Sequence, residues 1–418
     1  MDSSIKVLFC IYDSPGNISG PNAWLLRLLP SLKSDGIIPS VLVFSLKPSD
    51  SPTADALTLS GIQVSVFKFK STTRKKINWI LDFTSRHPPD VFVPNLVVAA
   101  YFAAGYLREV GIATVGVLHS DDPFYHALLE DFTIKNSFHC LSGLVCVSEY
   151  LQKRASKTAA DDVEIYKIPC GVPVPRGSAS VPGDTMNIIY VGRLEEEQKR
   201  ISDVTRSLCS VTRRVPGVKA YIFGDGSAVD AVRSIIRKEN AGDRVELVGR
   251  VSPHQIQSQM LKNHVIVLLS DYEGLPVALM EGMACGLVPV CKKTASGIPE
   301  LVSNDVNGLI VSDGGESFER AIELLKESPG LWKALSKRSK QTVLADFSNE
   351  ICASKWSDVL LAQAARMNRS VNLKFSALRR LPKIRRQFMR EDFRGHHAFT
   401  RVLNKALRVV DSNAKKKL

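Results

Sequence analysis

The chain has 418 residues, 44% of them hydrophobic and 23% charged, which is the composition of a globular protein long enough for two domains. Its net charge of +13 is unevenly placed: residues 369–418 hold fifteen Lys and Arg against three Asp and Glu, and the rest hold 40 against 39. The basic character therefore belongs to the C-terminal tail, and because no nucleic-acid motif accompanies it, we do not expect a nucleic-acid partner.

The sequence also gives no sign of secretion or of membrane insertion. Residues 1–6 lack the basic and apolar regions of a signal peptide, and Pro94 and Asn95 interrupt the longest mostly apolar stretch, 91–107. Eight Cys are scattered without a CxxC pair, which favours buried thiols in a reducing compartment. We therefore expect a cytoplasmic protein.

The first half of the chain alternates apolar runs with helical segments, which predicts an α/β domain over residues 1–175. We expect strands at 5–12, 41–44, 62–69, 90–94, 113–119 and 141–147. A helix should run from Pro21 to about Lys33, after a loop that contains Gly16 and Gly20. This loop lacks the G-x-G-x-x-G pattern of dinucleotide-binding enzymes.

Three features of this half have two interpretations each. A basic run over 68–76 precedes Trp79 and is either a solvated loop, which we favour, or a patch on anionic lipid. His119 ends a predicted strand, where α/β proteins bind ligands, although a lone His is more often structural. Asp121 and Asp122, which follow it, could contact an acceptor or cap the next helix.

The second half repeats the α/β pattern. A linker at 176–186 leads into a second domain at 187–345, with strands expected at 187–191, 218–223, 245–248, 265–269 and 288–290. A helix at 346–368 should cross back to the first domain. The tail at 369–418 alternates Arg and Lys with apolar residues at helical spacing, for example Leu378, Leu381, Arg385 and Phe388. Such a tail suits an interfacial helix on lipid, a helix packed on the body, or a partly disordered arm.

The most informative stretch follows the apolar run 265–269. Glu273 lies in a strand-to-helix loop, and Glu281 lies within the helix that follows. Free backbone N–H groups at Gly274, Leu275 and Val277 would suit a phosphate at the start of this helix. The two carboxylates would instead accept hydrogen bonds from hydroxyls, so the ligand carries both phosphate and sugar.

A second cluster of cations follows the strand at 187–191. Gly192 and Arg193 begin a strand-to-helix loop that reaches Lys199, and the two cations would suit a diphosphate. Arg200 is an alternative to Lys199. We see no metal-ligand cluster, and these cations could do what a divalent metal does elsewhere. Gly224 begins another turn at which the backbone approaches closely.

These motifs resemble those of retaining nucleotide-sugar glycosyltransferases of the GT-B fold, especially family 4 (glycosyl transferases group 1). The resemblance rests on Glu273 and Glu281, which have seven residues between them, on the Glu-Gly-Leu-Pro turn, and on Arg193 with Lys199. It covers residues 1–365 and departs from the family pattern at Ser19-Gly20 and Ser296-Gly297, where the family usually has two glycines. It implies an α/β protein with two Rossmann-like domains facing across a cleft, to which this chain adds a basic helical tail.

The resemblance also implies roles for single residues. Glu281 would bind the ribose, Glu273 and His119 the donor sugar, and Arg193 and Lys199 the leaving diphosphate. Gly20 would lie near the donor phosphates, and the backbone near Val251 would meet the nucleotide base. The implied reaction is a metal-independent transfer, with retention, from a UDP- or GDP-sugar to a glycan or lipid-linked acceptor, without a cofactor.

Other functions remain to be weighed against this one. A nucleotide-sugar epimerase of related fold would act without an acceptor. A non-catalytic scaffold could be recruited to an anionic membrane by the basic tail, although intact Arg193, Lys199, Glu273 and Glu281 argue against it. A nucleotide-dependent oxidoreductase is disfavoured by the missing glycine fingerprint.

Overall fold

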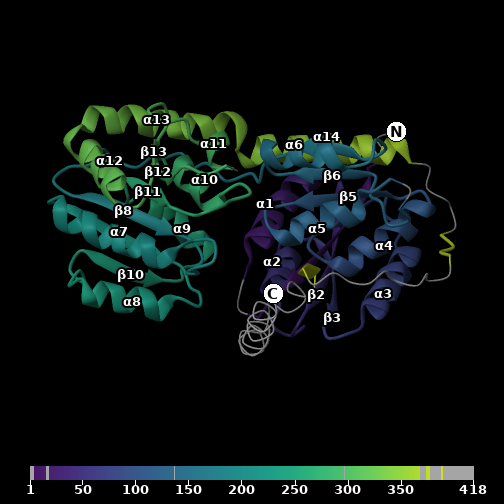
Figure 1. Ribbon diagram of the computed structural model, residues 1–418. Helices are drawn as coiled ribbons and strands as arrows, with labels where there is room; N and C mark the ends of the chain where they lie inside the picture. Colours follow the sequence, from purple (N-terminus) through teal and green to yellow (C-terminus); the bar gives the residue numbers. More distant parts are fainter. Residues whose placement is uncertain are drawn as a thin grey trace, which may run out of the picture.

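A computed structural model describes residues 4–15, 18–135, 137–295, 297–367, 373–376 and 387–388. The chain forms two α/β domains that lie side by side (Figure 1). Each is built on a sheet whose strands are all parallel. The predicted fold class is therefore confirmed, except that most of the tail lies outside the described residues.

The first sheet has the strand order β3-β2-β1-β4-β5-β6-β7. Its strands and helices alternate along the chain: β1 Lys6–Asp13, α1 Gly20–Ser34, β2 Ile38–Ser45, α2 Pro52–Leu59, β3 Gln63–Lys68, α3 Thr73–Arg86, β4 Val91–Pro94, α4 Val98–Glu109, β5 Ala113–Leu118, α5 Pro123–Phe132, β6 Gly143–Cys146, α6 Glu149–Thr158 and β7 Glu164–Lys167.

The second sheet has the order β10-β9-β8-β11-β12-β13. Its elements are β8 Met186–Val191, α7 Ile201–Arg214, β9 Val218–Phe223, α8 Val229–Lys238, β10 Val245–Gly249, α9 Pro253–Met260, β11 Val265–Leu268, α10 Val277–Ala284, β12 Val288–Lys292, α11 Ile298–Leu301, β13 Leu309–Val311, α12 Glu316–Glu327 and α13 Pro329–Asp346, followed by α14 Asn349–Arg366.

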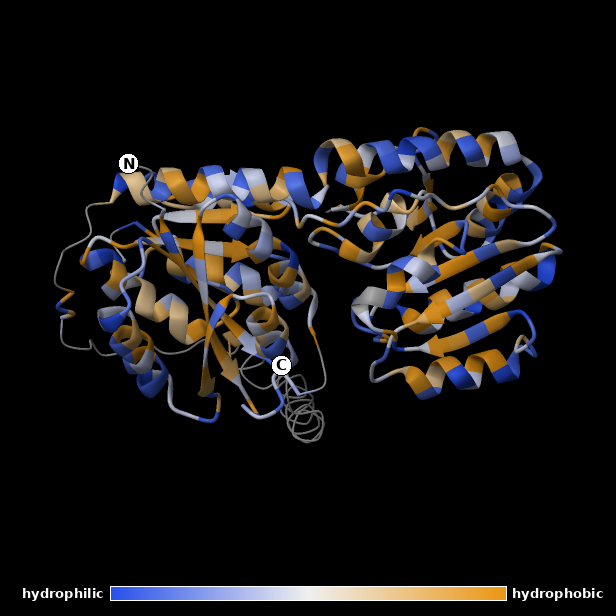
Figure 2. Ribbon diagram, turned by 180° about the vertical axis from the view of Figure 1, so that it is seen from behind, coloured by the Kyte–Doolittle hydropathy of each residue, from blue (hydrophilic) through white to orange (hydrophobic). Residues whose placement is uncertain are grey.

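The cores follow from the apolar strands. The central strands β4, β6 and β11 are buried throughout, because helices cover both faces of a parallel sheet. Figure 2 shows the hydrophobic strands inside each domain and helices of mixed hydropathy outside. All eight cysteines are buried and unpaired, as expected from their scattered positions.

The strand orders determine where each domain can bind a ligand. The order reverses between β1 and β4 in the first domain and between β8 and β11 in the second. In open α/β sheets, ligands bind beyond the carboxyl ends of the strands at such switch points. The loops at these points contain Gly20, Asn95, Arg193 and Glu273, so the topology places the main sequence motifs at the two expected edges.

Asp13 anchors the loop that follows β1. It is 2% exposed, and its carboxylate accepts from Ser51 Oγ at 2.8 Å, Thr53 Oγ1 at 2.7 Å and Thr53 N at 2.9 Å. The buried charge is therefore well solvated by hydrogen bonds at the start of α2. Ser19 then caps α1 by accepting from the backbone N–H of Asn22 at 3.3 Å.

Helix α14 belongs to the second half of the chain but lies along the first domain (Figure 1), where it packs against α1. Its Trp356 packs against Trp24 of α1, with ring centroids 5.5 Å apart. Ser357 Oγ donates to Asp35 Oδ2 at 2.7 Å, and Gln363 bonds to Tyr166 at 2.9 Å. The end of the chain thus completes the core of the domain in which the chain began.

The chain passes twice between the domains, and the two crossings are hydrogen-bonded to each other. The backbone N–H of Val172 donates to Phe347 O, and that of Asn349 donates to Val172 O, both at 3.0 Å. A Cβ on Gly171 would lie 2.7 Å from the Cα of Asn349, so this approach requires glycine. We call this paired segment the crossing seam.

The structure also bears on the two interpretations of the basic run at 68–76. Trp79 stacks on Phe67 with centroids 4.6 Å apart, and it also contacts Phe44 and Phe83. Lys76 is 4% exposed and lies 3.9 Å from the centre of the Phe69 ring. Trp79 is therefore partly buried in an aromatic cluster, which favours the solvated loop over the lipid-contact patch.

A few residues of the tail are described, and they contact the first domain. Ser376 Oγ donates to Glu109 at 2.8 Å, and Phe388 is 1% exposed against Phe124 and Phe132 of α5. Leu378, Leu381 and Arg385 lie outside the described residues. No helix in the described part of the chain is long and apolar enough to cross a membrane.

Candidate functional site

The centre of the candidate site is an ion pair between the loops that follow β8 and β11. Lys199 Nζ lies 2.5 Å from Glu273 Oε1, and Glu273 is 5% exposed. These loops are adjacent because β8 and β11 pair in the sheet. The structure therefore brings together one cation and one carboxylate that the sequence predicted from separate motifs.

Gln198 links this pair to Arg193 and was not predicted. Its Oε1 accepts from Arg193 Nη2 at 2.9 Å, while its Nε2 donates to Tyr272 O at 2.9 Å and lies 3.4 Å from Glu273 Oε2. Arg193 also pairs with Glu195 at 2.8 Å, and its side chain is 54% exposed. Arg193 thus reaches the Glu273 loop through Gln198. In the sequence, the signal that could have indicated Gln198 was an uncharged amide side chain among charged neighbours.

Lys199, and not Arg200, faces Glu273. Arg200 has a left-handed backbone conformation with φ of 52° at the start of α7. This conformation directs its guanidinium to Asp203 at 2.6 Å and Asp271 at 3.9 Å, away from the ion pair. A non-glycine residue in this region costs of order 1–3 kcal/mol, which neighbouring contacts must offset.

Glycines shape the edge where β8, β9 and β10 end. A Cβ on Gly224, whose φ is 142°, would lie 1.9 Å from Gly192 O. The backbone N–H of Gly224 donates to Gly249 O at 2.9 Å, and Val251 follows, partly buried. Backbone groups therefore line this edge, where the resemblance places the base.

The start of α10 is one of the points at which the domains touch. Pro276 occupies the N-cap position of α10, where no side chain caps the helix within the described residues, while Leu275 is 6% exposed and Val277 is partly buried. A Cβ on Gly274 would lie 2.2 Å from His119 O, across the domain boundary. The loop that leads into α10 thus lies against the backbone at the strand end that carries His119.

His119 is held by partners from the first domain. Its Nε2 lies 2.9 Å from Asn95 Oδ1, its Nδ1 lies 3.8 Å from Cys170 Sγ, and its ring packs edge-on against Trp24. Burial lowers the pKa of His119 to about 3, so the ring is neutral near pH 7. It therefore supplies no positive charge to the site. Leu96, which follows Asn95, has a φ of 63°.

Glu281 pairs with a residue that the sequence did not indicate. Arg27 Nη1, from α1 of the first domain, lies 2.7 Å from Glu281 Oε1, and their side chains are 18% and 21% exposed. Burial raises the pKa of the Glu281 carboxyl, and Arg27 opposes that rise. The only signal in the sequence that could have indicated Arg27 was a single Arg among the apolar residues of α1.

The remaining predicted positions lie near the cleft without joining the ion pair. Gly20 is the first residue of α1, and a Cβ there would meet open space. Asp122 caps α5 by accepting from the backbone N–H of Phe124 at 2.9 Å and of Tyr125 at 3.3 Å. Asp121 pairs with His126 at 2.7 Å. Both Asp residues therefore have structural partners.

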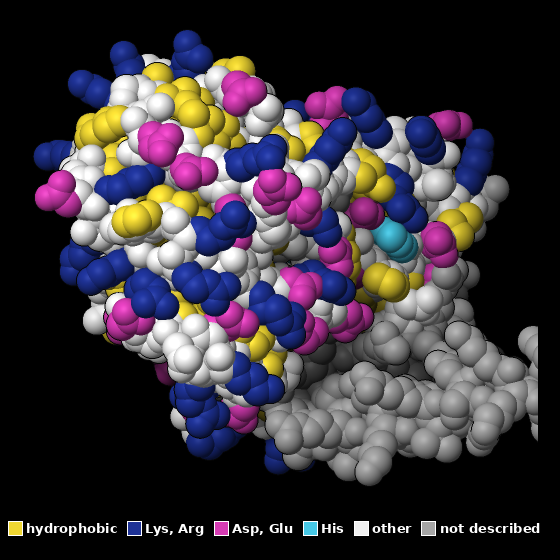
Figure 3. Space-filling model, turned by 60° about the vertical axis from the view of Figure 1, so that its left-hand side comes forward, with side chains coloured by type: hydrophobic (Ala, Val, Ile, Leu, Met, Phe, Trp, Pro, Cys, Tyr) yellow, Lys and Arg dark blue, Asp and Glu magenta, His cyan; other side chains and the backbone are white. Residues whose placement is uncertain are grey.

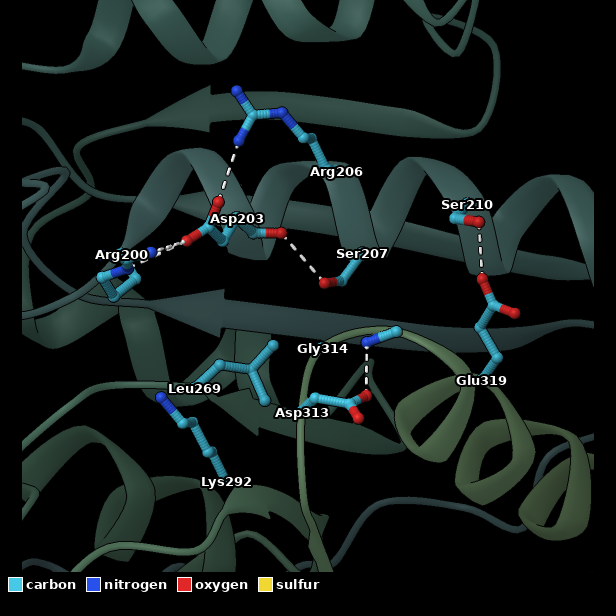
Figure 4. Close-up of a pocket in the computed structure, with 11 residues that line it drawn as sticks. Arg200, Asp203, Arg206, Ser207, Ser210, Leu269, Lys292, Asp313, Gly314 and Glu319 are labelled. Atoms are coloured by element: carbon cyan, nitrogen blue, oxygen red, sulfur yellow. Dashed lines mark hydrogen bonds and ion pairs between the residues drawn. The ribbon is translucent and has the colours of Figure 1, made fainter.

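A neighbouring cavity of about 420 Å³ lies on the other side of the Asp271 loop. Its lining mixes cations and anions, and in Figure 4 Asp203 lies between Arg200 and Arg206. Lys292 bonds to Asp271 at 2.9 Å. These charges satisfy one another, and on the face shown in Figure 3 basic and acidic side chains are likewise interspersed. Within the described residues, no His, Cys, Asp and Glu group is placed to hold a metal ion.

Comparisons with known proteins indicate the enzyme class and the fold. Residues 176–342 match the family model for glycosyl transferases group 1. The chain is 25% identical over 250 residues to the lipopolysaccharide 1,6-galactosyltransferase of Escherichia coli, an alignment that covers 57% of this chain and 66% of that protein. It is 32% identical over 186 residues to the amylovoran biosynthesis glycosyltransferase AmsK of Erwinia amylovora, covering 42% and 44%.

Solved structures show the same fold over a larger part of the chain. HepE from Anabaena, solved in complex with UDP, superposes with a TM-score of 0.68 at 18% identity and covers 86% of this chain and 100% of that one. Sucrose-phosphate synthase from Thermosynechococcus elongatus gives a TM-score of 0.70 at 16% identity, covering 87% and 100%. The second domain matches the group 1 model and the whole body has the GT-B architecture, so this protein is a glycosyltransferase of the GT-B fold.

Proposed function

We propose that the protein transfers a sugar from a UDP- or GDP-sugar to a glycan or lipid-linked hydroxyl, with retention of configuration and without a metal ion. The observation that carries the proposal is the Lys199–Glu273 ion pair beside the uncapped start of α10, opposite His119. This arrangement offers anion-binding groups and hydroxyl-binding groups within one cleft, which is what a nucleotide-sugar requires.

In the proposed complex, each group meets the part of the donor that its chemistry suits. Ribose hydroxyls donate to Glu281, and the amides at the start of α10 bind phosphate oxygens. Arg193 and Lys199 stabilise the negative charge that grows on the leaving diphosphate. Such preorganised charge stabilisation typically contributes about 3 to 4 kcal/mol for each donor removed.

Glu273 and His119 would position the sugar itself. Glu273 is ion-paired with Lys199, so it presents a carboxylate to the sugar hydroxyls, and the neutral His119 adds an uncharged hydrogen-bonding group. The acceptor oxygen forms the new bond to the anomeric carbon as the bond to the diphosphate breaks. A phosphate oxygen of the leaving group takes the acceptor's proton, so no separate general base is needed.

The acceptor class rests on the relatives. The proteins that align with this chain include enzymes named for lipopolysaccharide and amylovoran synthesis, and both names denote glycan assembly. HepE was solved with UDP and glucose and with UDP-glucose, which supports a nucleotide-sugar donor. We therefore favour a growing glycan, free or lipid-linked, as the acceptor.

The decisive experiment is a donor panel. Purified protein is titrated with UDP-, GDP- and ADP-sugars, with and without EDTA, and thermal shift and released diphosphate are read for wild type and Arg193→Ala. We expect one donor to stabilise the wild type and to be hydrolysed slowly, with EDTA having no effect and the variant losing turnover. A donor converted to an isomer without acceptor would instead indicate an epimerase, and no response to any donor would favour the scaffold.

A further inference from the structure

The ion pair between Arg27 and Glu281 joins the two domains at the proposed donor site. Arg27 lies in α1 of the first domain, and Glu281 lies in α10 of the second, so the 2.7 Å contact exists only while the domains are together. We propose that Arg27 is a positioning residue for the nucleotide, which holds the Glu281 carboxylate ionised and oriented toward the ribose. This inference rests on the proposed function.

The pair uses only one polar atom of each side chain. Arg27 uses one nitrogen, Nη1, and Glu281 uses one oxygen, Oε1. A purely structural Arg–carboxylate pair is often two-pronged and uses both oxygens. Here the described contacts leave Glu281 Oε2 as an acceptor, and a ribose hydroxyl can occupy it without displacing the arginine.

The other groups of Arg27 show that it is not held by its own domain. Its Nε and Nη2 atoms are buried and have no hydrogen-bond acceptor among the described residues. Desolvating an arginine in this way is costly, so the Glu281 contact is its main electrostatic compensation. The guanidinium also lies near Cys170, whose Sγ contacts His119. Arg27 therefore lies between the ribose-binding and sugar-binding sides of the cleft.

The other ionisable groups around Glu281 do not replace Arg27. Helix α10 packs against α9, α13, β11 and β12. Cys285, one turn further along α10, has its pKa raised by burial, and Lys340 of α13 bonds to the linker carbonyls of Pro175 and Gly177 at 2.8 and 2.6 Å. The pKa of Glu281 is raised by burial and lowered by Arg27. Without Arg27, Glu281 would take up a proton at a higher pH and lose its charge.

The test measures UDP and GDP binding by calorimetry between pH 6 and 9 for wild type, Arg27→Met and Arg27→Lys. A hydrogen bond to a charged group is lost when Glu281 is protonated, so we expect Arg27→Met to weaken nucleotide binding about tenfold near pH 6. The loss should shrink as the pH is raised, because ionisation of the Glu281 carboxyl is favoured at higher pH. Arg27→Lys, which keeps the charge, should restore most of the affinity.

Two further variants make the result specific. Arg108→Met removes a cation of the first domain that pairs with Asp162 at 3.9 Å, and it should leave binding unchanged. In a Glu281→Gln background, which has no carboxyl to titrate, Arg27→Met should cause no additional pH-dependent loss. Thermal unfolding of each variant establishes that it is folded.

The possible outcomes separate the two hypotheses. If the wild type binds UDP or GDP and Arg27→Met binds equally well at every pH, the role of Arg27 is wrong and the proposed function stands. A loss that is the same at all pH values, or that persists in the Glu281→Gln background, would likewise overturn it. If the wild type binds neither nucleotide, both the function and this inference fail.

Discussion

The two sides of the cleft are built in different ways. The second domain presents an ion pair, Lys199 with Glu273, and the amide of Gln198 lies beside it. The first domain presents the neutral ring of His119, held by Asn95, Cys170 and Trp24 from three separate elements. The donor side therefore depends on electrostatics and the opposite side on packing, and the two should respond differently to mutation and to pH.

The largest effect should come from removing charge on the donor side. Glu273→Gln keeps the shape of the side chain but leaves Lys199 without its counter-ion, so we expect transfer to fall at least about 100-fold. Steady-state rates measure the change. Glu239→Gln, which breaks an exposed pair with Arg213, should remain within about twofold of wild type. Near-native activity of Glu273→Gln would contradict the assignment.

A steric change tests the contact between the two sides. A Cβ on Gly274 would lie 2.2 Å from His119 O, so Gly274→Ala must push the domains apart or distort the loop. We expect kcat/KM to fall about 10- to 100-fold, corresponding to roughly 1–3 kcal/mol of overpacking. Gly242→Ala, where nothing lies within 4 Å, is the matched control. Equal behaviour of the two variants would show that the contact is not part of the active arrangement.

Acidification should lower the stability of the first domain through protonation of His119. Burial lowers the pKa of His119 from 6.5 to about 3, so the unfolded chain binds more protons between these values. The stability that His119 contributes to the folded state is therefore fully present above pH 6.5. It is lost as the pH falls, by at most about 1.4 kcal/mol per pH unit. Denaturant unfolding at pH 7 and pH 5 measures this, and His119→Asn should reduce the dependence. His264, whose pKa is lowered to about 4, contributes in the same direction in both proteins.

The smallest effect should come from Asp122, which lies near the cleft but caps α5. Asp122→Ala should cost about 0.5–2 kcal/mol of stability and leave the transfer rate unchanged. Thermal unfolding and an acceptor titration together decide the point. An increased acceptor KM in a variant of normal stability would show that the carboxylate contacts the acceptor instead.

Much of this arrangement could be predicted from the sequence, because most of the site residues directly follow recognisable strands. The strands are continuous apolar runs, and Glu273, Glu281, Arg193 and Lys199 lie in loops or helices directly after such strands. Parallel strands bring their carboxyl ends to one edge, so neighbours along the chain become neighbours in the site. The choice of Lys199 over Arg200 needed the structure, because it depends on the left-handed backbone at Arg200.

The residues that were missed make contacts across long separations in sequence. Arg27 is 254 residues from Glu281, and Asn95 and Cys170 reach His119 from different elements. No spacing rule connects such positions in a single sequence. Trp79 shows a different case, in which the basic run at 68–76 allowed two interpretations, and the structure packs the tryptophan within an aromatic cluster.

The crossing seam limits how the cleft can open. Two independent tethers would let the domains slide and separate, whereas Val172 bonded to Phe347 and Asn349 acts as a single pivot. With α14 packed on α1 of the first domain, we expect motion about this pivot to be mainly rotation. Opening would then be a hinge rotation of one domain relative to the other, with the largest displacement at the points farthest from the crossing seam.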